Sequence, residues 1–144
     1  MIGAVAMLVA GDHADRRGDR FRDAFWLILV MAAALLTIAA APSPLLVMLA
    51  YLGFATTCFT INMLLSSGWA EVLHVRDLAV GAAAINSVAN LGGFALPFAW
   101  GAARDATGGF GAGLVALAMF ALVAAVLTLR VRAGVRRRQA VAVA

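Results

Sequence analysis

Two asparagines lie inside an apolar stretch of the chain, where an unpaired polar side chain is costly. Residues 78–103 contain Asn86 and Asn90 but no charged residue. The two amides are four residues apart, so on a helix they share one face. Asn90 would lie about 18 Å along such a helix from Leu78, close to the middle of a ~30 Å hydrocarbon layer. At that depth amides need protein partners or a water-filled cavity. The pattern therefore predicts either hydrogen bonding to a polar solute or bonding between neighbouring helices.

A second group of residues whose side chains could do chemistry lies near the start of the chain. Gly11, Asp15, Arg16, Gly18 and Arg20 follow the spacing G-x-x-x-D-R-x-G-x-R. The glycines permit close helix approach and a tight turn, the second with a positive φ. The carboxylate can accept hydrogen bonds at a helix N-terminus, and the two guanidinium groups can form charge-assisted bonds. We expect this loop to act as a conformational latch; the alternative is a solvated loop that only sets topology.

The composition requires a membrane around these residues. Of the 144 residues, 65% are hydrophobic and only 12% are charged, whereas a soluble domain is about one quarter charged. The charges form clusters separated by long apolar runs. These runs predict an all-α, polytopic transmembrane helix bundle over 1–130, with spans at about 1–10 (partial), 24–41, 45–69, 78–103 and 106–129.

The arginines give this bundle an orientation. All eleven basic residues are Arg, and alternate threading of the spans puts ten of them on one side and only Arg104 on the other. Because cytoplasmic loops are enriched in basic residues, we expect the loop at 11–23 and a basic tail at 131–144 to be cytoplasmic. The expected location is a cell membrane, of the bacterial inner-membrane type, with the lipid bilayer as the solvent.

The loop at 11–23 also resembles the cytoplasmic loop signature of the major facilitator superfamily. That signature occurs between the second and third helices and again between the eighth and ninth. Four spans follow it here, which matches the second position. The resemblance implies about four and a half helices from the C-terminal half-bundle of a twelve-helix transporter, an N-terminally truncated fragment whose partner is the missing N-terminal half-bundle.

A narrower resemblance lies in the fourth span and the turn after it. The run A-I-N-S-V-A-N-L-G-G-F-x-x-P, then G-x-x-x-D-A-T-G-G-F, is similar to the eleventh helix of the anion:cation symporter family. The resemblance implies alternating-access symport of a small organic anion, with protons as the coupling ion. It also implies that Trp69 and Ser66 line the anion cavity beside Asn86 and Asn90. The alternative for Trp69 is an aromatic residue at the membrane surface.

Other classes of function have little support in the sequence. We find no cofactor motif, no metal-ligand cluster and no nucleophile beside a base, so no enzyme is expected. The net charge of +4 reflects arginines that flank apolar spans, so no nucleic-acid partner is expected. The competing hypotheses are a small dimeric exporter and a non-transporting helical membrane protein or partner subunit.

Overall fold

A computed structural model describes residue 12 and residues 18–143 of the chain, with the side chains of 69–72 and 138–143 left undescribed. Four long helices make up this part: α2 (Arg20–Ala40), α3 (Pro44–Val72), α4 (Leu78–Thr107) and α5 (Gly111–Val143). Each is long and apolar enough to cross a membrane. The described part is therefore an all-α bundle of membrane-spanning helices, as the sequence predicts.

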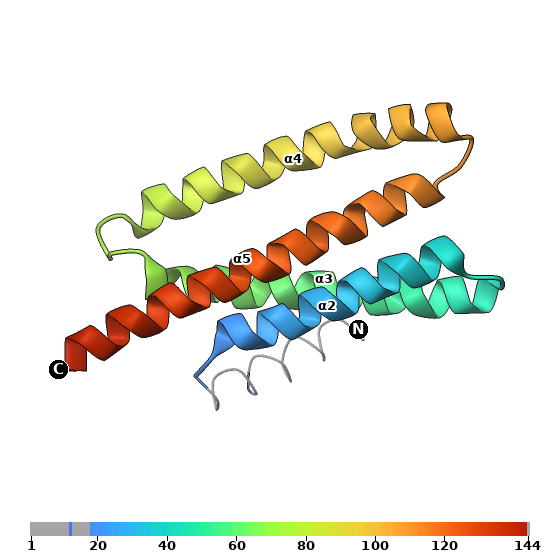
Figure 1. Ribbon diagram of the computed structural model, residues 1–144. Coiled ribbons are helices and arrows are strands. Elements are labelled where there is room, and N and C mark those ends of the chain that lie inside the picture. The colour runs from blue at the N-terminus through green and yellow to red at the C-terminus, as the bar shows by residue number, and fades with distance from the viewer. Residues whose placement is uncertain (1–11, 13–17, 144) are drawn as a thin grey trace.

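Three of the helices form the packed part of the bundle. α2 lies against both α3 and α5, while α4 touches α3 and α5 only sparsely (Figure 1). The buried core is made of Ile28 and Ala32 of α2, Ile61 of α3, and Ala121 and Ala125 of α5. The three alanines let the helix backbones approach closely, and helices in lipid associate through such close packing because the hydrophobic effect does not drive them together.

A glycine allows close packing between α2 and α3. A Cβ atom at Gly68 would lie 3.1 Å from the ring of Phe21, and both residues are buried. Close packing here joins the start of α2 to the end of α3.

Several helix boundaries differ from those expected. α2 begins at Arg20 rather than at 24, and α5 begins at Gly111 rather than at 106. α4 continues past 103, through Arg104 and Asp105, to Thr107. It ends at Gly108, whose φ of +73° lets its N–H donate to the Arg104 carbonyl oxygen, so the turn comes later than the charge pair suggests. α5 continues without a break past 130 to Val143, so the expected basic tail begins as an extension of the same helix.

The described arginines gather at one end of the bundle. The helices alternate in direction, so the start of α2, the turn between α3 and α4, and the C-terminal part of α5 lie together (Figure 1). We call this the arginine end; it contains Arg20, Arg22, Arg76, Arg130, Arg132, Arg136 and Arg137. Arg104 lies at the other end, as alternate threading of the spans requires.

Candidate functional site

The candidate site is a cavity between α3 and α4, two helices that pack together only sparsely. Its volume is about 510 Å³, within the usual range for small-molecule sites. α3 contributes Asn62, Leu65 and Ser66, and α4 contributes Ala82, Ala83, Ile85, Asn86 and Ala89. The cavity exists because α4 stands away from α3 over this stretch and small alanines line its inner face.

Three side chains give the cavity its polarity. Asn62, Ser66 and Asn86 are all exposed, and within the described part of the chain none of them hydrogen-bonds to another protein group. The neighbouring Ser87 behaves differently, because its hydroxyl donates to the Ala83 carbonyl oxygen of its own helix at 2.9 Å. The three lining side chains therefore have donors and acceptors available for water or a solute.

The cavity lies in the half of the bundle nearer the arginine end. Asn86 is about 12 Å along α4 from Leu78, and Asn62 is about 15 Å along α3 from Val72. A solute in the cavity would thus lie within the span but closer to the basic side. Arginines gathered at one end raise the local concentration of anions.

The residues predicted from sequence for this site differ in their positions relative to the cavity. Ser66 and Asn86 lie together on the cavity wall. Asn90 is exposed but is not among the lining residues. Trp69 belongs to α3, and its side chain lies outside the described part of the chain. Asn62 was missed, although its position four residues before Ser66 puts both on one helix face.

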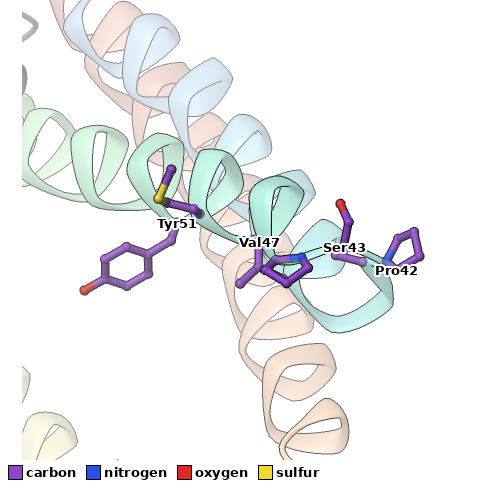
Figure 2. Close-up of a pocket in the computed structure, with 7 residues that line it drawn as sticks. Pro42, Ser43, Val47 and Tyr51 are labelled. Carbon is purple, nitrogen blue, oxygen red and sulfur yellow. The ribbon is translucent and has the colours of Figure 1, made fainter.

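A larger hollow at the opposite end is a weaker candidate. It has a volume of about 560 Å³ and is lined by the α2–α3 turn and the first turns of α3. Figure 2 shows Pro42 and Ser43 in the turn, with Val47 and Tyr51 along α3. The Ser43 hydroxyl already accepts from the Leu46 N–H at 3.4 Å. Among the described residues, only this turn and α3 line the hollow, so they offer a solute one wall.

The loop predicted as a latch is described only at its end. Gly11, Asp15 and Arg16 lie outside the described residues. Gly18 has a φ of +62°, the positive value expected from its place in the turn. The Arg20 guanidinium donates to the Ser67 carbonyl oxygen of α3 at 3.2 Å, so this arginine connects the start of α2 to α3.

The most extensive polar contact in this region involves Asp19, which sequence reasoning did not single out. The Arg132 Nε donates to both carboxylate oxygens at 3.0 and 2.9 Å, and its Nη2 donates at 2.6 Å. Arg136 adds a bond from Nη2 at 2.8 Å. One carboxylate oxygen also accepts from the Arg22 N–H at 3.2 Å and so caps α2. The hydrogen bond from Arg132 is the main reason that the pKa of Asp19 is lowered.

Another carboxylate lies one turn further along α2. Asp23 is in the first turn of that helix, where an anion is favoured by the helix dipole. Its Oδ2 is buried and has no hydrogen-bond partner in the described part of the chain. By register with the Asp19–Arg132 pair, Asp23 lies at the level of Thr128 on α5, whose hydroxyl donates to its own helix at the Ala124 carbonyl oxygen.

Comparison with known proteins adds a second line of argument. The chain is 34% identical over 134 residues to a protein of Agrobacterium vitis named "Putative tartrate transporter". It is 30% identical over 139 residues to one of Acinetobacter baumannii named "Quinolone resistance transporter". These matches cover 90% and 96% of this chain but only 29% and 32% of the relatives. The chain therefore spans about a third of the length of the curated relatives that it matches.

Both of these relatives are named as transporters. A second Agrobacterium vitis protein with the same name is 31% identical over 136 residues. No protein-family profile and no solved structure matches the chain. The four candidate spans support a multi-pass membrane protein, and the relatives that the chain matches are named as transporters.

Proposed function

We propose that this chain forms one wall of the substrate cavity of a secondary transporter for small organic anions. The anion moves by alternating access, coupled to protons. The chain supplies a C-terminal set of helices, and a further half-bundle closes the cavity and carries the proton-coupling and anion-binding charges. The relatives are named as transporters. The proposal adds a substrate class and a transport mechanism.

The observation that carries the proposal is the set of polar groups in the α3–α4 cavity that have no partner among the described protein groups. Asn62, Ser66 and Asn86 come from two helices that are otherwise apolar enough to span a membrane. Leaving such groups without partners in lipid costs free energy, which a water-filled substrate path avoids. Transporters with this kind of helical architecture bind substrate between their repeats, within the membrane.

Charge supports an anionic substrate. The arginine end faces the cytoplasm in this proposal, and the cavity lies nearer to that end. An organic acid leaving the site passes a surface of positive potential, whereas a cation would be repelled there. The name of the Agrobacterium vitis relative mentions tartrate, which is an anion of this class.

The loop before α2 completes the mechanism. Arg20 and Asp19 fix the end of this loop to α3 and α5. The preceding residues Gly11, Asp15 and Arg16 then form the latch, which contacts the other half-bundle in one conformation and releases it in the other.

The test is uptake by a chimera in which this chain replaces the matching segment of the Agrobacterium vitis protein. Radiolabelled tartrate should accumulate in cells that express the chimera, and Asn86→Leu should reduce the initial rate. Ser87→Ala is the matched control, because that hydroxyl bonds its own helix outside the cavity lining. Amounts of each variant in the membrane are compared by immunoblot. Unchanged uptake by Asn86→Leu contradicts the site, and an Asn86-dependent uptake of a quinolone instead of tartrate contradicts the substrate class.

A further inference from the structure

The C-terminal part of α5 carries its arginines on two different faces. Arg132 and Arg136 are about 40° apart around the helix and both bond Asp19. Arg130 and Arg137 are about 20° apart, and this pair lies about 130° around the helix from the first pair. Both are exposed, and within the described part of the chain neither has a hydrogen bond or ion pair. One face is thus neutralised in part by α2, and the other presents two unpaired guanidinium groups.

The position of these two arginines along the helix matches the bilayer surface. The residues from Gly111 to Leu129 are uncharged and extend about 28 Å, close to the thickness of the hydrocarbon layer. Arg130 is the first charge after them, and Arg137 lies about 10 Å further along. The two side chains, which can bend toward the interface, bracket the layer that phospholipid headgroups occupy.

We propose that the Arg130–Arg137 face of α5 is a binding site for the headgroups of anionic phospholipids. The guanidinium group is suited to this partner, because its fixed fork of N–H donors matches the oxygens of a phosphate. α5 continues as a helix through this region, so the two groups are held at a fixed spacing. The site lies on the arginine end, outside the α3–α4 cavity, and does not depend on the proposed substrate.

The experiment measures lipid retention by the intact chain. The purified chain is reconstituted in nanodiscs that contain equal amounts of phosphatidylglycerol and phosphatidylcholine. It is then released into the gas phase, and native mass spectrometry counts the lipids that it retains. Wild type should retain phosphatidylglycerol selectively. R130Q/R137Q should lose this selectivity by about fivefold for each arginine, the factor that corresponds to the ~1 kcal/mol attraction of a surface basic residue for anionic lipid.

Three control variants separate a specific site from general electrostatic attraction. R104Q removes a charge at the opposite end of the bundle and should leave selectivity unchanged. R132Q/R136Q removes the same number of charges at the same end but from the face that bonds Asp19, so its effect should be the smaller. R130K/R137K keeps the two positive charges but removes the guanidinium groups. For every variant, helix content measured by circular dichroism shows that the protein is folded. Equal retention by R130Q/R137Q and wild type overturns the proposal, as does an equal loss from the two double glutamine variants.

Discussion

Substitution of Asp19 tests how the start of α2 is held in the bundle. Its carboxylate receives three hydrogen bonds from Arg132 and one from Arg136, and it caps α2 through the Arg22 N–H. The side chains of Asp19 and Arg132 are only 15% and 23% exposed, whereas that of Arg136 is 63% exposed. The Arg132 contact should therefore dominate, and the Arg136 contact is screened by solvent.

The magnitude follows from these contacts. A charge-assisted pair that is this deeply buried contributes about 2 kcal/mol to the free energy of unfolding, and an N-cap contributes about 1 kcal/mol. Asp19→Ala should thus lower the free energy of unfolding by about 3 kcal/mol, and Asp19→Asn, which still caps the helix, by about 2 kcal/mol. The assay is loss of helical circular dichroism during titration of mixed micelles with sodium dodecyl sulfate.

The same contact makes a prediction for pH. Because the pKa of Asp19 lies below its ordinary value of 3.8, the folded protein binds fewer protons than the unfolded chain in this range. The stabilisation is then fully present above that ordinary value and is lost as the pH falls through the lowered pKa of the folded state. Asp19→Asn should lack this acid-dependent loss. Asp105→Ala, an exposed change at the other end of the bundle, is the control. An effect of Asp19→Ala no larger than that of Asp105→Ala would refute the reasoning.

Two further predictions concern packing and the cavity. Gly68→Val should lower the free energy of unfolding by about 1–3 kcal/mol, because the new side chain meets the Phe21 ring. Gly53→Ala is the control, because a Cβ there meets nothing within 4 Å. It should not lower the free energy of unfolding in the same micelle titration. Asn62→Leu should reduce tartrate uptake by the chimera without changing its amount in the membrane, because Asn62 lines the cavity from α3. Uptake like that of Ser87→Ala would remove Asn62 from the site.

The membrane-spanning helices could be predicted from sequence because each one depends on the composition of its own segment. In lipid, a long uncharged apolar run can pair all of its backbone groups within itself only as a helix. The end of α4 was harder to locate. Arg104 lies over the ring of Phe110, 4.6 Å from its centroid, and this contact, together with the αL glycine at 108, lets the helix continue past a charged pair.

The contacts between helices could not be predicted in the same way. Asp19 and Arg132 are 113 residues apart in the chain, and nothing local marks them as partners. Ser66 was predicted from a family resemblance, and Asn86 from an unusual polar position within an apolar run. Asn62 was missed because it was read as part of an apolar run, and only the separation of α3 from α4 reveals the cavity that it lines.

Water access to Asn86 tests the central claim most directly. In the chimera, with Cys58→Ser to remove the native thiol, Asn86→Cys and Val88→Cys place a thiol on nearly opposite faces of α4; only position 86 lines the cavity. Inside-out vesicles are treated with a charged, membrane-impermeant thiol reagent, with and without tartrate. We predict that position 86 is modified faster than position 88 and that tartrate slows modification at position 86 alone. Equal modification of the two positions, or no protection by tartrate, would contradict a substrate cavity between α3 and α4.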